Sequence, residues 1–400
     1  MSFSIATSGL NAVTEQLNAI SNNIANSGTV GFKSGRAEFA ALYADSQPLG
    51  VGVSGVTQSI TKGGTITSTG TALDLAINGN GFFMVRDSEG TTAYTRAGYF
   101  GTDNNGNLVN NQGMYMQGYP VDANGALQVG TIGNLSISSG SIPAKATSSI
   151  DFTANLDARA EAPKTSPFDP KDNTSYNNSY TTQVYDSLGR EHTLNQYFVK
   201  TGENTWDVHY YMDDKPVTSG GADQVQSLTF NSQGILTDPT GAVGLSADID
   251  GADAIAIDMS YNGTTQYGSD FSVSKNKGDG YASGERTGQA IDEDGSVYAT
   301  FSNGERLLQG QLVLANFTNP NGLKSQDGTT WAQTASSGAP LTGAPGSGLL
   351  GSIVSGALES SNVDLTSELV GLMSAQRNYQ ANTKVISTND SMMNSLFQAL

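Results

Sequence analysis

The chain has 400 residues, including 19 basic and 37 acidic residues, 48 glycines and no cysteine. Its net charge of −18 disfavours binding to nucleic acid or to anionic membranes. The lack of cysteine excludes disulfides, thiolate nucleophiles and zinc–thiolate sites, and many glycines with 14% charged residues favour a β-rich body. The length is enough for two or three domains.

The N-terminal segment carries apolar residues at alternating spacings of three and four. This N-terminal seam consists of Phe3, Ala6, Leu10, Val13, Leu17, Ile20 and Ile24. The spacing predicts one apolar face on a helix, as in coiled coils, over residues 1–27. We expect Gly28 to be the left-handed residue just past its end. No long apolar run precedes Lys33, the first basic residue, so we expect neither a Sec-type signal peptide nor a transmembrane span.

Residues 28–70 are rich in glycine and threonine, and we expect a compliant linker or an ordered arm. The segment from Gly50 to Gly55 matches the G-x-G-x-x-G dinucleotide fingerprint in its letters alone. A strand-like run follows it where the fingerprint requires a helix, so we interpret it as a glycine-rich turn.

The middle of the chain alternates short strand-like segments with turns that begin with Asp or Asn and end with Gly three residues later. These turns are Asp87–Gly90, Asp103–Gly106, Asp122–Gly125, Asp186–Gly189, Asn231–Gly234 and Asp292–Gly295. Such turns close hairpins and predict antiparallel β domains. A shift in composition predicts a first, discontinuous β domain over residues 71–144 and 280–361, with a second, outer β domain over 145–279 inserted in it.

The residues that could carry chemistry form no convincing site. The two histidines, His192 and His209, lie in alternating strand patterns without a nucleophile motif or a metal partner at helical spacing. The calcium-loop-like start at Asp103 lacks the required glycine and the bidentate glutamate, because Leu108 and Met114 stand there. We therefore predict no catalytic residue, no metal site and no cofactor.

A second helical seam closes the chain, over residues 362–400. This C-terminal seam consists of Leu365, Leu369, Leu372, Tyr379, Ile386, Met393 and Phe397. Polar Gln376, Thr383 and Asp390 interrupt it, which weakens it alone but can fix the register among neighbouring helices. Ser361 or Asp364 is suited to cap this helix. Seams at both ends predict a core of paired helices from which two β domains extend outward.

Both ends resemble the axial proteins of the bacterial flagellum, a family of rod, hook and hook-associated subunits. The resemblance rests on Asn22, Asn23, Ala25, Asn26, Gly28, Gly31, Phe32, Lys33, Asn362, Val363, Asp364, Gln376, Arg377, Tyr379 and Gln380. The large middle is similar to that of the family's hook subunits, whereas its rod subunits carry a smaller one.

The resemblance implies a structural subunit rather than an enzyme. It implies self-assembly into a flexible curved tube outside the cell that acts as a universal joint and transmits motor torque to the filament. Implied partners are further copies of the chain, the rod, the hook-associated junction proteins, the hook cap and the flagellar type III export apparatus. The alternatives are a distal rod or hook-associated subunit or, from another class, a secreted β-rich adhesin or enzyme.

Overall fold

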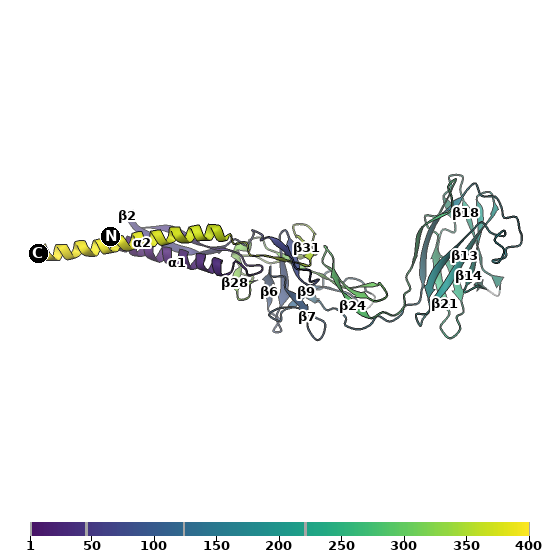
Figure 1. Ribbon diagram of the computed structural model, residues 1–400, viewed down its shortest axis with the longest axis horizontal. Coiled ribbons are helices and arrows are strands. Elements are labelled where there is room, and N and C mark those ends of the chain that lie inside the picture. The colour runs from purple at the N-terminus through teal and green to yellow at the C-terminus, as the bar shows by residue number, and fades with distance from the viewer. Residues whose placement is uncertain (1, 45–46, 123–124, 220–221, 400) are drawn as a thin grey trace. The chain divides into compact units, whose positions relative to one another are not determined.

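The computed structural model describes residues 2–44, 47–122, 125–219 and 222–399, and these residues form two compact units (Figure 1). The first unit contains the chain up to residue 139, residues 288–300 and the chain from residue 306 onward. The second unit contains residues 140–287 and 301–305. The sequence-based boundaries of independently folding domains, and the insertion of one domain in the other, stay predictions.

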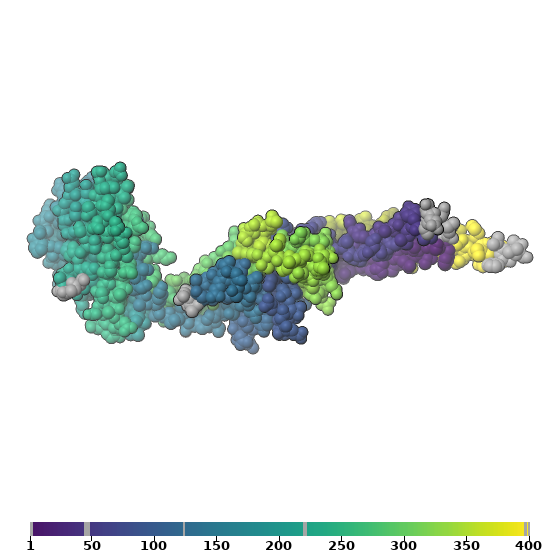
Figure 2. Space-filling model, turned by 180° about the vertical axis from the view of Figure 1, so that it is seen from behind, coloured from purple at the N-terminus to yellow at the C-terminus, as the bar shows by residue number. Residues whose placement is uncertain are grey.

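Two helices at the chain ends pack side by side in the first unit, as predicted (Figure 1). Helix α1 spans Ser2–Ala25 and helix α2 spans Leu365–Ala399. They are antiparallel, because Gly9 lies against Asn382 whereas Ile20 lies against Gly371. At this register the last turns of α2 extend beyond the start of α1, and Figure 2 shows that end emerging uncovered.

A long two-stranded hairpin follows α1 within the predicted linker or arm. Strand β1 (Gly35–Ala44) pairs with β2 (Gln47–Gln58), and both strands contact α1. The expected glycine-rich turn at Gly50–Gly55 is wrong, since these residues lie within β2 beside two irregularities of register. Gly50 has a φ of 118°, and a Cβ there would lie 2.1 Å from Ser8 Oγ. Glycine thus allows the hairpin to approach α1 closely.

The rest of the first unit is a β region made of short strands. Its elements are β3 (Ile66–Ser68), β4 (Leu75–Asn78), β5 (Phe82–Arg86), β6 (Thr92–Thr95), β7 (Phe100–Thr102), β8 (Leu108–Asn110), β9 (Tyr115–Pro120), β10 (Gly133–Asn134), β24 (Arg286–Ile291), β25 (Ser296–Phe301), β26 (Arg306–Leu312), β27 (Leu314–Asn316), the 3-10 helix η1 (Pro320–Gly322), β28 (Lys324–Gln326), β29 (Thr330–Ala332), β30 (Leu341–Gly343), β31 (Ser352–Ser355) and β32 (Ala357–Glu359).

The main sheet of this region runs in the order β24-β25-β26-β9-β5-β6-β29-β28. An aromatic cluster packs against it, in which Phe82 lies edge-on to both Phe317 and Trp331. Two short pairs, β3–β32 and β4–β31, join the start of the region to its end. The segments leading from α1 and into α2 therefore meet in one place.

The second unit is built around two packed sheets, with a separate short strand pair, β16–β17. Its strands are β11 (Ser149–Asp157), β12 (Asn178–Tyr185), β13 (Glu191–Gly202), β14 (Thr205–Met212), β15 (Lys215–Pro216), β16 (Thr218–Ser219), β17 (Ala222–Asp223), β18 (Val225–Phe230), β19 (Leu236–Asp238), β20 (Val243–Ala247), β21 (Ile255–Ser260), β22 (Thr265–Tyr267) and β23 (Ser272–Gly278).

One sheet runs β20-β21-β11-β22, with β23 also on β11, and the other runs β12-β13-β14-β18-β19. Fully buried Phe152, Trp206 and Tyr261 belong to the core shared by both sheets. The expectation of purely antiparallel pairing is wrong at β11, which pairs in parallel with β21 and β22. Those partners come from distant parts of the chain, so hairpin signals between neighbouring strands could not reveal the pairing.

The predicted turns are confirmed, although the two central residues of the turn Asp122–Gly125 lie outside the described residues. In each, the closing glycine has a positive φ and its N–H donates to the backbone carbonyl of the first residue, over 2.9–3.2 Å. The Asp103 carboxylate accepts the N–H groups of Asn105 and Asn107, each at 2.8 Å, so it serves its own turn. No helix in the described parts of the chain is long and apolar enough to cross a membrane.

Candidate assembly site

The N-terminal seam packs largely against α2 of the same chain. Val13 and Ile20 are buried in one cluster with Ala375, and Leu17 and Ile24 pack against it half-buried. Ala6 is buried, Leu10 is half-buried, and Phe3, near the start, stays 51% exposed. The predicted seam therefore forms one helix–helix contact within the subunit.

The C-terminal seam is mostly uncovered. Leu365, Leu369, Tyr379 and Met393 are each 43–50% exposed, Ile386 is half-buried, and only Leu372 joins the cluster with α1. The contact with α1 instead uses the adjoining stripe of Gly371, Ala375 and Asn382, whose small or polar side chains allow close approach. The strongest apolar stripe of α2 is thus free to contact another molecule.

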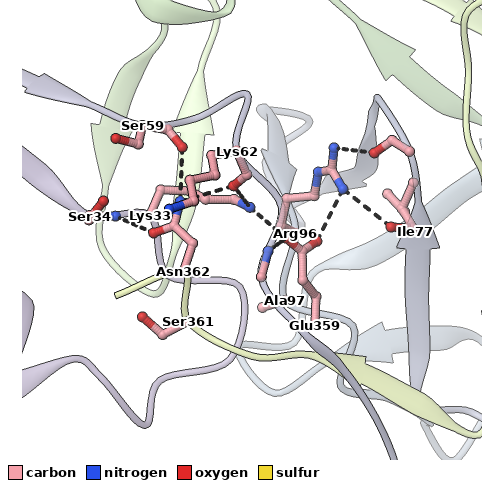
Figure 3. Close-up of polar contacts among 12 residues, drawn as sticks. Lys33, Ser34, Ser59, Lys62, Ile77, Arg96, Ala97, Glu359, Ser361 and Asn362 are labelled. Carbon is pink, nitrogen blue, oxygen red and sulfur yellow. Dashed lines mark hydrogen bonds and ion pairs between the residues drawn. The ribbon is translucent and has the colours of Figure 1, made fainter. Parts of the chain in front are cut away.

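A buried charge cluster ties both helices to the β region (Figure 3). Glu359, at the end of β32, contacts Lys33 Nζ through Oε1 at 2.5 Å and Arg96 Nη1 through Oε2 at 3.1 Å. All three side chains are at most 5% exposed. Oε1 also accepts the N–H of Gly64, at 2.9 Å, and Lys33 Nζ donates to the carbonyl of Lys62 at the same distance.

One carboxylate therefore faces two cations away from water. Burial lowers the pKa of Lys33 and of Arg96, and the Glu359 carboxylate opposes both shifts. Arg96 is anchored further by Nη2, which donates to the carbonyl of Gly79 at 2.8 Å. Because a buried charge without its partner is costly, the cluster holds the three segments in one arrangement.

Amides from the two terminal motifs complete this junction. Asn23 of α1 donates to Gly35 O (2.8 Å) and to Glu368 Oε1 of α2 (2.9 Å), and it accepts the Gly35 N–H (2.8 Å). Asn362 accepts the Ser34 N–H at 2.7 Å (Figure 3). Motifs more than 300 residues apart in sequence thus share one network.

The chain leaves α1 through a sharp reversal at Gly31. Its φ is 71°, and a Cβ there would lie 2.5 Å from the backbone N of Ala97. The expectation for Gly28 is wrong, because Gly28 has no positive φ and faces open space. Successive backbone turns carry the chain past the helix end, and the left-handed residue comes only where the backbone meets the β region.

The other motif residues occupy local positions. Asp364 caps α2, since Oδ1 accepts the N–H groups of Thr366 (2.9 Å) and Ser367 (3.1 Å). Ala25, the last residue of α1, and Gly28 just beyond it are exposed. Asn22, Asn26 and Phe32 line a cavity of about 340 Å³ at the C-terminal end of α1. Half-buried Val363 lies between Asn362 and the cap.

Part of the predicted site does not reach the junction. Gln376, Arg377, Tyr379 and Gln380 are all exposed on α2. Met1 and Leu400, at the ends of the predicted helical segments, lie outside the described residues. The same holds for the side chain of Phe397. The sequence analysis did not identify Arg96 as a site residue. The available signal was its position, since a charged residue stands directly after strand β6.

Comparison with known proteins agrees with this architecture. Family models match residues 3–33 (flagella basal body rod protein), 76–154 (flagellar hook protein FlgE/F/G D1 domain), 155–281 (flagellar basal body protein FlaE D2 domain) and 354–399 (flagellar basal body rod FlgEFG protein C-terminal).

Curated relatives match at full length. The chain is 43% identical to the flagellar hook protein FlgE of Salmonella typhimurium, with 99% of each chain covered. It is 42% identical to that of Escherichia coli K12, again over 99% of each. A crystal structure of the Helicobacter pylori flagellar hook protein FlgE2 shares the fold, with a TM-score of 0.53, 15% identity, 74% of this chain covered and 100% of that chain.

Paired terminal helices, an exposed seam on one of them and a β-rich middle define an axial protein of the bacterial flagellum. Within that class, the length-matched relatives decide the assignment. The chain belongs to the flagellar hook protein family.

Proposed function

We propose that this chain is a structural subunit of the flagellar hook that polymerises through its terminal helices into a flexible, curved tube. The single observation that carries the proposal is the uncovered C-terminal seam, in a chain that belongs to the hook family. Burying a leucine stabilises a contact by about 2 kcal/mol, and every copy in a polymer repeats the gain. The tube would act as a universal joint between motor and filament.

The same proposal extends to partners and location. Further copies of the chain are the main partner, with the rod at one end, hook-associated junction proteins at the other and a hook cap during growth. The subunit would reach the cell exterior through the flagellar type III apparatus without a cleaved signal peptide, and its role would be structural rather than enzymatic. A rod subunit is the weaker alternative, since hook proteins match the whole length.

The structure identifies Leu369 as the best position for a test. It is 50% exposed, whereas Leu372 also packs against α1, so a change at Leu372 would disturb the subunit itself. Leu369→Asp places a carboxylate in the proposed contact, where an unpaired charge costs several kcal/mol. We expect tubes of the wild-type chain, and none of the variant, in negative-stain images of purified protein.

Ser374→Asp is the matched control, because Ser374 is exposed on α2 away from the seam. It should polymerise nearly as well as the wild type. Circular dichroism of both variants should match that of the wild-type monomer. Normal tubes from Leu369→Asp would show that this part of the seam makes no subunit contact.

A further inference from the structure

His192 connects two turns of the second unit. It is the second residue of β13 and follows the turn Asp186–Gly189 by three residues. Its side chain faces the turn that joins β14 to β15 at Asp213. Its Nδ1 lies 2.5 Å from Asp213 Oδ2, and its Nε2 lies 3.3 Å from Asp186 Oδ2. The imidazole side chain is only 12% exposed.

Other bonds hold both carboxylates in place. Asp186 is fully buried and accepts the N–H groups of Leu188 (2.9 Å) and Arg190 (2.8 Å), as well as Arg190 Nε (2.6 Å). Asp213 Oδ1 accepts the N–H of Thr193 at 2.9 Å. Each carboxylate therefore presents an acceptor oxygen to one ring nitrogen of His192.

A neutral imidazole has one N–H, so it can donate to only one of two acceptors. An imidazolium donates to both. We infer that His192 is a proton-dependent staple, which joins these two turns when its ring is doubly protonated and releases one of them when the ring loses a proton.

The turn at Asp213 has an uncommon backbone conformation. Asp213 and Asp214 have φ angles of 47° and 61°, a left-handed conformation that non-glycine residues seldom adopt. Their adjacent negative charges also repel one another. A cationic ring bound to Asp213 offsets this repulsion, whereas a neutral ring carries no charge that could do so.

The remaining charges near His192 are mixed in sign. A cavity of about 430 Å³ adjoins the ring and is lined by Arg190 and Lys215, together with Asp248 and Asp250. Lys215 Nζ lies 3.6 Å from Asp250 Oδ2, and Arg190 is engaged with Asp186, so these cations are already paired. The two carboxylates in direct contact with the ring therefore dominate its surroundings.

The pKa directions agree with this geometry. Burial alone lowers the pKa of His192, but the hydrogen bonds to Asp213 and Asp186 outweigh burial and raise it above 6.5. Burial likewise disfavours the charged carboxylates, yet their hydrogen bonds hold the pKa values of Asp186 and Asp213 below the usual 3.8.

These pKa shifts make the stability of the fold depend on pH in opposite ways for the histidine and for the carboxylates. The stabilisation of the fold by His192 is complete below pH 6.5 and is lost as the pH rises through the raised pKa of the ring. The stabilisation of the fold by Asp186 and Asp213 is present above pH 3.8 and is lost as the pH falls through their lowered pKa values. The contact of His192 with one of the two turns is therefore lost when the pH rises above the pKa of the ring.

The test is an NMR titration of the full-length monomer labelled at histidine. The chain has only two histidines, and burial lowers the pKa of the other one, His209, which serves as an internal control. His209→Gln assigns the two signals. We expect His192 to titrate above 6.5 and His209 below it, with both ring nitrogens of His192 protonated at pH 6.

Asp213→Asn removes one acceptor and should lower the pKa of His192 while leaving that of His209 unchanged. A neutral His192 ring at pH 6 in the wild type, or a His192 that titrates at or below 6.5, would overturn the inference. An unchanged pKa of His192 in a folded Asp213→Asn variant would do the same. The wild-type titration decides the matter even if that variant does not fold.

Discussion

Replacing Glu359 by glutamine should strongly destabilise the first unit. The substitution keeps the shape of the side chain but leaves Lys33 and Arg96 buried without a counter-charge. The new amide NH₂ group would also point a donor at one of these cations. Removing one partner from a buried ion pair costs about 3–5 kcal/mol. At a urea m-value of about 2 kcal/mol/M, the unfolding midpoint should fall by about 1.5–2.5 M.

The two tryptophans allow each unit to be followed separately, since Trp331 is buried in the first unit and Trp206 in the second. A Trp206→Phe background makes Trp331 the only tryptophan, and its fluorescence then reports urea unfolding of the first unit. In a Trp331→Phe background the second unit should unfold at the same midpoint with or without Glu359→Gln.

Arg36→Gln is the control for charge loss as such. It breaks the Arg36–Glu38 pair, in which the arginine side chain is 79% exposed, and should leave the midpoint unchanged. A fall of less than about 0.5 M for Glu359→Gln, with the m-value of the wild type, would mean that the cluster contributes little to stability.

Three further predictions concern the same junction and the second unit. Gly31→Ala should lower the free energy of unfolding of the first unit, followed by Trp331 fluorescence, by well over 1 kcal/mol. The reasons are the left-handed φ of Gly31 and the backbone of Ala97 at the position of a Cβ. Gly28→Ala should leave this free energy nearly unchanged. Asn23→Ala leaves the N–H and C=O of Gly35 without partners and should lower the free energy of unfolding by about 1–3 kcal/mol for each unsatisfied group. Asn23→Asp should not restore it, because a carboxylate oxygen would then face Glu368 Oε1 and the Gly35 carbonyl, to which the amide NH₂ group donates. Deletion of residues 145–279 should leave a cooperative Trp331 transition, and a broad, non-cooperative transition would refute the proposed domain boundary.

Local rules made much of the fold predictable from sequence. The helix periods and the Asx–Gly turns depend on residues close together in the chain, and the structure has both. The hairpin β1–β2 was not predicted, since Gly50 and Gly52 weaken a strand pattern. The role of Gly50 becomes visible only where α1 packs against it.

The candidate site was predictable at its ends but not at its centre. Asn23 and Lys33 belong to one terminal motif and Asn362 to the other, yet no local pattern shows that Arg96 joins them. On α2 the apolar period identified the exposed stripe, whereas the stripe that meets α1 contains Gly371 and Asn382, which carry no hydrophobic signal. Contacts made by small or polar residues depend on the partner surface, which one sequence does not display.

The Lys33–Glu359 pair also has a mechanical consequence. Lys33 lies in the segment that leaves α1, and Glu359 lies in the segment that leads into α2. These two segments, called the two arms below, are therefore bonded to each other where they enter the β region. The Asn23–Glu368 and Ser34–Asn362 bonds act as further cross-links between the arms. Tension applied along either helix is therefore divided between both arms before it reaches the β strands, and neither arm can be drawn out without stretching its neighbour.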